Sequence, residues 1–292
     1  MNTMKKTGNL ISKNKLKFSI LTVMCCYVFI CQSCIRMRMS KKETKDFFSA
    51  SKTVYEENTI QFENFKVHYI ETGNKEASTL FLVHGSPGSW DAYKEYLNDS
   101  LLLSKYRMIA VDRIGFGRSN FGDSQNLSLH AKILEKIADS LNNGRPIYLV
   151  GHSYGGPTIV QMATDRPQNF KKLIILAGAL DPKAETPENW RAVIKTIPLR
   201  YLIPGALRPS NDELWWLKKD LYVLQPNLSK LISEVIIFHG TKDPLVPYKN
   251  VAYMQKEFIN AKSIKVIPIE NANHFIPWEH FEEIRDVLYK LE

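Results

Sequence analysis

The stretch Ile-Tyr-Leu-Val-Gly-His-Ser-Tyr-Gly-Gly, residues 147–156, determines how the rest of this chain folds around it. Its four leading apolar residues predict a buried strand, and the run 157–166 that follows predicts a helix. The Gly-X-Ser-X-Gly turn between them is typical of a nucleophile elbow, which presents the Ser153 hydroxyl at a sharp strand-to-helix turn. Glycines at 151 and 155 leave room where such a turn crowds its neighbours. The N–H groups at the start of the helix favour a developing negative charge.

Short apolar runs of the same kind recur along the chain and alternate with segments of helical periodicity. Strands are predicted at 79–83, 108–111, 173–177, 235–238 and 264–269. A half-exposed hairpin is expected over 59–72, where apolar and polar residues alternate in places. Buried strands separated by helices indicate the α/β class, with a mostly parallel sheet covered by helices on both faces.

The alternation of strands and helices breaks between residues 181 and 233. This segment is helical and irregular in pattern, with several prolines and with Trp190, Trp215 and Trp216. Because strands are predicted on both sides of it, we expect a small helical lid at the C-terminal edge of the sheet. The expected domains are a signal peptide or membrane anchor at 1–33, a tether at 34–58, an α/β core at 59–180 and 234–292, and the lid at 181–233. Within the tether, residues 40–51 are expected to form a charged linker or a short helix that leads into the domain.

The positive charge of the chain belongs to its N-terminal leader. Residues 1–40 carry seven basic residues and no acidic one, which leaves only +2 of the formal +9 for residues 41–292. A basic nucleic-acid-binding face is therefore not expected. All four cysteines lie between residues 25 and 34, so the core can form neither a disulfide nor a thiolate metal site.

The leader has the pattern of an export signal. The apolar run Phe18–Ile30 suits a signal-peptide core better than a membrane span, which needs about 20 residues. The Ser33-Cys34 pair that follows resembles a bacterial lipoprotein cleavage site with Cys34 as the lipidated residue, although Cys31 stands where leucine is usual. An uncleaved anchor and a cleaved, secreted form are the alternatives. All three predict export, and the first two make the membrane a partner.

A serine hydroxyl needs a neighbouring base, which a third group must orient, before it becomes a good nucleophile. Asp243 follows the strand predicted at 235–238, and His274 follows the last predicted strand. Because loops at the carboxyl ends of parallel strands converge on one crevice, we expect Ser153, Asp243 and His274 to meet there. Asp181 also follows a strand and is the alternative acid.

From about residue 60 to 292 the chain resembles the α/β-hydrolase-fold family, which includes carboxylesterases, carbon–carbon bond hydrolases, epoxide hydrolases and haloalkane dehalogenases. The motifs that carry the resemblance are His-Gly-Ser-Pro-Gly (84–88), Asp-Arg-Ile-Gly-Phe-Gly-Arg-Ser (112–119), Gly-His-Ser-Tyr-Gly-Gly (151–156), Gly-Thr-Lys-Asp-Pro-Leu-Val-Pro (240–247) and Asn-His-Phe (273–275). The order serine, acid, histidine is that of this fold. The resemblance implies that the backbone N–H groups of Ser86 and Tyr154 form the oxyanion hole.

The remaining expectations concern the substrate. The pocket is expected to be lined by His152, Phe275, Trp215 and Trp216. Because the lid side of such a pocket is apolar, an uncharged ligand is expected. A serine rather than an aspartate at 153 argues against epoxide hydrolase and dehalogenase chemistry. We expect a serine hydrolase that cleaves a small or medium carboxylic ester through an acyl-enzyme, without a metal or cofactor. A carbon–carbon bond hydrolase, an aminopeptidase and a non-catalytic binding protein are the alternatives, and the oligomeric state stays open.

Overall fold

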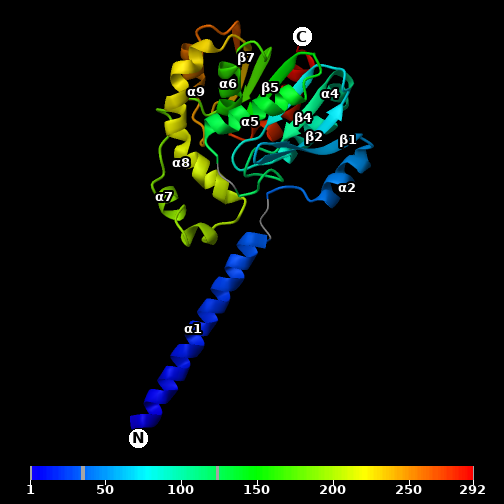
Figure 1. Cartoon of the computed structure of the whole chain (residues 1–292). Coiled ribbons are helices and arrows are strands. Elements are labelled where there is room, and N and C mark those ends of the chain that lie inside the picture. The colour runs from blue at the N-terminus through cyan, green and yellow to red at the C-terminus, as the bar shows by residue number, and fades with distance from the viewer. Residues whose placement is uncertain (1, 34–36, 123–124, 292) are drawn as a thin grey trace.

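The computed structural model describes residues 2–33, 37–122 and 125–291, and it builds the domain around one eight-stranded sheet (Figure 1). The strand order is β1-β2-β4-β3-β5-β6-β7-β8. The strands are β1 Tyr55–Phe62, β2 Phe65–Gly73, β3 Thr79–Val83, β4 Arg107–Val111, β5 Ile147–His152, β6 Lys172–Leu176, β7 Glu234–Gly240 and β8 Ser263–Ile269. Strand β2 is antiparallel to both of its neighbours, whereas β3 to β8 run parallel. The prediction of a mostly parallel α/β sheet is confirmed.

Helices cover both faces of the sheet because successive strand residues point to opposite sides. Phe81 and Val83 of β3 pack with α5 Leu127–Ser140, α6 Gly155–Asp165 and α9 Lys249–Glu257. Leu80 and Leu82 of the same strand belong to a second apolar cluster on the other face. The helices of that second face are α2 Lys41–Ser51, η1 Trp90–Tyr93, α3 Lys94–Asn98, α4 Ser100–Lys105, α10 Ile276–Glu279 and α11 Phe281–Tyr289.

The segment expected to be a tether is largely part of the domain. Helix α2 begins with a capping box, in which the Ser40 N–H donates to Glu43 Oε2 at 2.6 Å and the Glu43 N–H donates to Ser40 Oγ at 3.2 Å. Phe48 is fully buried and stacks on the Tyr55 ring, with centroids 4.4 Å apart. The expectation of a tether to residue 58 therefore needs correction, because α2 and the first half of β1 are packed against the core.

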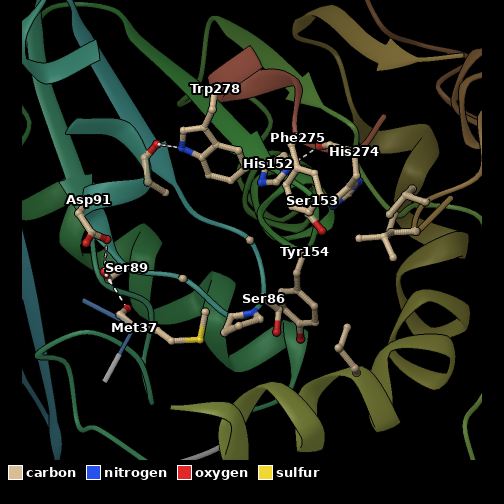
Figure 2. A pocket seen from close by; sticks show the side chains of 18 of the residues that line it. Met37, Ser86, Ser89, Asp91, His152, Ser153, Tyr154, His274, Phe275 and Trp278 are labelled. Atoms are coloured by element: carbon tan, nitrogen blue, oxygen red, sulfur yellow. Dashed lines mark hydrogen bonds between the residues drawn. The ribbon is translucent and has the colours of Figure 1, made fainter. Parts of the chain in front are cut away.

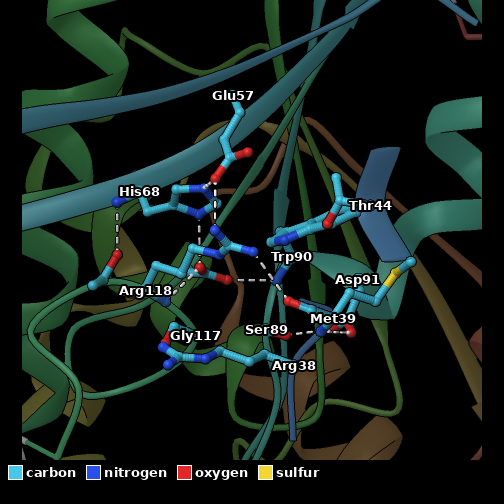
Figure 3. Close-up of polar contacts among 12 residues, drawn as sticks. Arg38, Met39, Thr44, Glu57, His68, Ser89, Trp90, Asp91, Gly117 and Arg118 are labelled. Carbon is cyan, nitrogen blue, oxygen red and sulfur yellow. Dashed lines mark hydrogen bonds and ion pairs between the residues drawn. The ribbon is translucent and has the colours of Figure 1, made fainter. Parts of the chain in front are cut away.

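Residues 37–40, which we call the N-terminal strap, are held against the domain by polar contacts (Figure 3). The Met39 N–H donates to Asp91 Oδ2 at 2.9 Å, and the Met39 carbonyl accepts from Arg118 Nη2 at 3.2 Å. The Met37 carbonyl accepts from Ser89 Oγ at 3.4 Å. These contacts join the strap to the loops that follow β3 and β4.

The lid segment between β6 and β7 contains α7 Trp190–Ile194, η2 Leu199–Leu202, α8 Leu207–Leu224 and η3 Gln225–Lys230. Helix α8 packs onto the core through the buried side chains of Leu217, Leu221 and Leu224. By contrast, neither α7 nor η2 contains a buried residue. The lid therefore has one part anchored in the core and one part that lies on the surface.

The leader forms α1, Asn2–Ser33, which extends away from the domain (Figure 1). Its apolar side chains from Leu16 to Ile30 are exposed apart from contacts near its end, where the Tyr27 hydroxyl donates to the Leu202 carbonyl at 3.0 Å. No helix within the described part of the chain has the length and apolar content that crossing a membrane requires. Cys34, the expected site of lipidation, lies outside the described residues.

Candidate active site

The predicted elbow is present between β5 and α6. Ser153 has a φ of 53°, in the left-handed region that costs energy for a residue with a side chain. The glycines around it are needed for space: a Cβ on Gly151 would lie 2.3 Å from the Gly155 carbonyl oxygen, and one on Gly155 would lie 2.2 Å from the Val83 carbonyl oxygen. The sharp turn places Ser153 at the wall of a pocket, next to the end of β3.

Asp243 and His274 meet beside this pocket. The His274 Nδ1 donates to Asp243 Oδ2 at 2.7 Å, while Asp243 Oδ1 accepts from the N–H groups of Leu245 at 2.9 Å and Val246 at 2.8 Å. Burial by itself raises the pKa of Asp243, but the hydrogen bonds from His274 and Val246 outweigh it and hold that pKa below its usual value. Asp243 is therefore a carboxylate at neutral pH, and it leaves Nε2 of His274 as the basic nitrogen.

Ser153 and His274 line the same pocket, and Figure 2 shows the two side chains next to each other. No hydrogen bond joins the Ser153 hydroxyl to His274 among the residues that the structure describes. Such contacts are often long without substrate and shorten when it binds. The alternative acid, Asp181, instead accepts from the Lys183 N–H at 2.8 Å. The structure thus brings Asp243, and not Asp181, to the histidine.

Backbone donors lie on both sides of Ser153. Gly85 approaches it so closely that a Cβ there would lie 3.0 Å from the Ser153 Cβ. Within the described ranges, neither the Ser86 N–H nor the Tyr154 N–H donates to another protein group. Helix α6 begins at Gly155, so its positive end also faces the serine. These two N–H groups are therefore available for the oxyanion hole that the resemblance implied, which stays a prediction.

His152 lies in the pocket wall, as expected, and it also supports the candidate base. Its Nε2 donates to the His274 carbonyl at 3.1 Å, and the two rings lie 4.8 Å apart. Burial, aided by the nearby His274, lowers the pKa of His152 to about 3. His152 is therefore neutral at physiological pH and orients its neighbour. Trp278, whose ring lies 5.2 Å from that of His152, also lines the pocket and was not singled out from the sequence.

The pocket has a volume of about 1530 Å³ and combines residues of the core, the lid and the N-terminal strap. Phe275 lines it as predicted, whereas Trp215 and Trp216 do not; on α8 the pocket is lined by Leu214 and Leu217. Residues three positions apart share a helix face, while the two tryptophans between them are rotated away by roughly 100° per residue. This corrects the predicted pocket, although its apolar character on the lid side remains.

A buried ion pair links the lid to the 84–88 loop, which carries the candidate oxyanion donor Ser86, and sequence analysis did not find it. Arg113, fully buried, donates to Glu213 Oε2 at 2.6 Å and Oε1 at 2.9 Å. The same guanidinium donates to the carbonyls of His84 at 3.0 Å and Gly85 at 2.8 Å. His130 adds a contact at 3.2 Å to Glu213. Arg113 therefore fixes the 84–88 loop and α8 together. The pairing is visible only in the tertiary structure, because the two residues lie 100 positions apart in the sequence.

Glu213→Gln is expected to destabilise the fold by about 3 kcal/mol at pH 7, because it leaves the buried Arg113 charge without its partner. Burial opposes ionisation, but Arg113 lowers the pKa of Glu213 to about 2, against 4.5 for the free side chain. The Glu213 side chain therefore stays ionised to a lower pH in the folded state than in the unfolded state. This stabilisation is complete above pH 4.5 and is lost as the pH falls towards 2.

Urea unfolding of the wild type and of Glu213→Gln between pH 7 and pH 3 measures this effect. The difference in unfolding free energy should shrink as the pH falls below about 4.5, since glutamine does not titrate. A constant difference across that range would show that the lost stability comes from packing and not from the ion pair.

No cluster of histidine, cysteine, aspartate and glutamate side chains able to hold a metal ion occurs in the described part of the chain.

A family model described as "alpha/beta hydrolase fold" matches residues 78–202, which include β3, β4, the elbow and β6. Among solved structures, that of a membrane phospholipase A from a bacterium has a TM-score of 0.65 at 19% identity, and covers 96% of this chain and 95% of its own. An esterase from Exiguobacterium antarcticum has a TM-score of 0.64 at 18% identity, with 79% and 97% coverage. The chain has the α/β-hydrolase fold. At sequence identities of 19% and 18%, these two structures show the fold of the chain. They do not show its substrate.

Curated relatives match shorter parts of the hydrolase-fold chain. Proline iminopeptidase of Lactobacillus acidophilus is 30% identical over 149 residues, which are 49% of this chain and 50% of that protein. A 2-hydroxy-6-oxononadienedioate/2-hydroxy-6-oxononatrienedioate hydrolase of Escherichia coli is 30% identical over 118 residues, 39% of this chain and 40% of that protein. Epoxide hydrolase 4 of Mus musculus is 28% identical over 120 residues, 40% and 33% respectively. The matches span a third to a half of these relatives.

Proposed function

We propose that this α/β-hydrolase-fold protein is a serine hydrolase that cleaves carboxylic esters through an acyl-enzyme. The observation that carries the proposal is the 2.7 Å contact between His274 Nδ1 and Asp243 Oδ2 beside the strained Ser153. Serine at the elbow, a histidine with a free Nε2 and an ionised acid are the three parts that acyl transfer needs.

The reaction proceeds in two halves. Nε2 of His274 takes the proton from Ser153 Oγ as this oxygen attacks the ester carbonyl, and the Ser86 and Tyr154 N–H groups stabilise the resulting oxyanion. His274 then returns the proton to the departing alcohol, and the ester C–O bond breaks. Water, activated by the same histidine, releases the carboxylic acid from Ser153. Asp243 holds the histidine tautomer and stabilises its charged form in both halves.

An epoxide hydrolase fits less well, because that chemistry proceeds through an alkyl ester on a carboxylate and the elbow here carries Ser153. An aminopeptidase needs an acidic group that binds the substrate ammonium. Four acidic residues of the described chain line the pocket. Burial and the nearby Asp181 raise the pKa of Glu185 to about 7, and the carboxylates of Glu43, Asp91 and Glu188 already bind the Ser40 N–H, the Met39 N–H and Arg191. A carbon–carbon bond hydrolase uses the same triad and is the second candidate.

Rapid-mixing kinetics with p-nitrophenyl butyrate test the proposal. An acyl-enzyme predicts a burst of nitrophenolate equal to the enzyme concentration, followed by slower steady turnover. In parallel assays the enzyme should cleave esters of increasing chain length faster than alanine p-nitroanilide or a 1,5-dioxo compound. Faster cleavage of the anilide or of the carbon–carbon bond would assign the pocket to the corresponding alternative.

We also propose that the protein is exported and held at a membrane by its leader, either through lipidated Cys34 or through uncleaved α1. The basic residues before Phe18 and the apolar run to Ile30 support export. Mass spectrometry of the mature N-terminus distinguishes the two anchors: a mature chain that begins at a diacylated Cys34 indicates a lipoprotein, and an intact leader indicates an anchor.

A further inference from the structure

The surface part of the lid, residues 190–202, exposes an unusual amount of apolar surface. We call this segment the lid face. It contains α7 and η2, and neither buries a single residue. Its exposed large apolar side chains, with their relative exposures, are Trp190 (49%), Val193 (57%), Ile197 (77%), Tyr201 (46%) and Leu202 (38%). Several exposed large apolar side chains within one short segment indicate an interaction site.

The lid face adds basic residues to its apolar ones, namely Arg191, Lys195 and Arg200. Arg191 pairs with Glu188 and Arg200 pairs with Asp212, so of these three Lys195 is the basic side chain that no carboxylate among the described residues neutralises. A segment that joins tryptophan, tyrosine and aliphatic residues to basic ones is typical of elements that lie in a membrane interface.

The lid face is continuous with the leader. The Tyr27 hydroxyl donates to the Leu202 carbonyl at 3.0 Å, and Figure 1 shows α1 leaving the domain on the side of α7. The apolar side chains of α1 are exposed around the helix, including Phe18 (72%), Val23 (69%) and Phe29 (68%). The 18–30 stretch of α1 is apolar around the helix and favours an apolar environment, whereas the part before it is basic and polar. One lipid surface would cover both the leader and the lid face.

The catalytic pocket reaches the same side of the molecule. Its lining extends from Ser153 through the strap residues Met37 and Met39 to Arg191, the neighbour of exposed Trp190 (Figure 2 shows Met37 and Ser153 in this pocket). Cys34 precedes Met37 by three positions, a span of at most about 11 Å of chain. Where α1 is retained as the anchor, the contact of Tyr27 with Leu202 places that anchor beside the lid face.

We infer that the lid face docks on the lipid bilayer and that the pocket takes its ester from that bilayer, so that the substrate is an amphiphile with a long acyl chain. This inference rests on the proposed hydrolase and names its substrate class. The acyl group passes from the ester oxygen to Ser153 Oγ, the proton taken by His274 goes to the leaving alcohol, and water then releases a fatty acid. The apolar lining by Leu214, Leu217 and Met39 receives the chain.

The test compares two substrates that release the same chromophore. The full chain, reconstituted with vesicles of phosphatidylcholine and phosphatidylglycerol, is assayed with p-nitrophenyl butyrate in the water phase and with p-nitrophenyl palmitate dissolved in the vesicles. The variant is Ile197→Asp, on the lid face and outside the pocket lining. Its matched control is Ile259→Asp, which replaces an equally apolar side chain of similar exposure (70% against 77%) just after α9.

We expect Ile197→Asp to hydrolyse the butyrate within about twofold of the wild-type rate and the palmitate about tenfold more slowly, since it replaces a membrane-buried isoleucine with a charge. Ile259→Asp should hydrolyse both esters at the wild-type rate. Equal palmitate rates for all three proteins, or equal losses in both variants, would overturn the docking inference. Failure of the proposed function gives a different result, in which the wild type cleaves neither ester.

Discussion

Ser153→Ala is expected to lower kcat for p-nitrophenyl butyrate by about 10⁶-fold, the loss seen when the nucleophile of a serine triad is removed. The reason is that the covalent route disappears, since His274 then has no hydroxyl to deprotonate. KM should change little, because the pocket wall and the backbone donors remain in place. Steady-state kinetics, with correction for the uncatalysed hydrolysis of the ester, measure both constants.

The fold should tolerate this change, which makes the result easy to interpret. The Ser153 hydroxyl forms no hydrogen bond within the described residues, and alanine adopts the φ of 53° at a similar cost. The thermal unfolding midpoint should therefore stay within a few degrees of that of the wild type. A folded variant with more than a hundredth of the wild-type activity would rule out Ser153 as the nucleophile.

Asp243→Asn is expected to lower kcat by about 10⁴-fold with the geometry intact, as the corresponding change does in a serine protease. In the wild type, His274 Nδ1 donates a hydrogen bond of 2.7 Å to the Asp243 carboxylate, whereas asparagine presents to it either an NH₂ group or a weaker acceptor. The tautomer that keeps Nε2 basic is then no longer enforced. Rates measured from pH 5 to pH 10 separate a lost tautomer, which lowers the plateau, from a simple pKa shift, which moves the profile.

Asp181→Asn is the matched control for this prediction. Asp181 also follows a strand and is buried, but it accepts from the Lys183 N–H and does not contact His274. Its kcat should remain within about tenfold of the wild type, because Asp181 is not among the described residues that line the pocket. If Asp181→Asn lowers kcat more than Asp243→Asn does, the assignment of the acid is wrong.

The sheet and the triad could be predicted because their signals are local. Each parallel strand is a short apolar run, and each candidate catalytic residue follows one of these runs directly, so that topology alone brings 153, 243 and 274 to one edge. The hairpin was also found, although β1 begins at Tyr55 and not at residue 59, and β2 is buried from residue 67 to 72 instead of half-exposed. The charged residues around Phe47 and Phe48 concealed the fact that α2 packs against the core.

Features that depend on three-dimensional proximity could not be predicted in this way. The pair of Arg113 and Glu213 joins residues a hundred positions apart, and no periodicity connects them. The choice of Leu214 and Leu217 over Trp215 and Trp216 depends on the rotation of α8 about its axis, which the irregular sequence before it does not set. The strap contacts of Met37 and Met39 likewise arise only when the strap meets the loops after β3 and β4.

The account depends on Ser153 being an activated nucleophile, and labelling with a fluorophosphonate tests this most directly. The reagent loses fluoride to an activated serine and leaves a phosphonyl group that mass spectrometry locates. The account predicts one label per folded chain, on the peptide that contains Ser153, and none on Ser153→Ala or on the heat-unfolded chain. A folded, unlabelled Ser153, or a label on another residue, would contradict it.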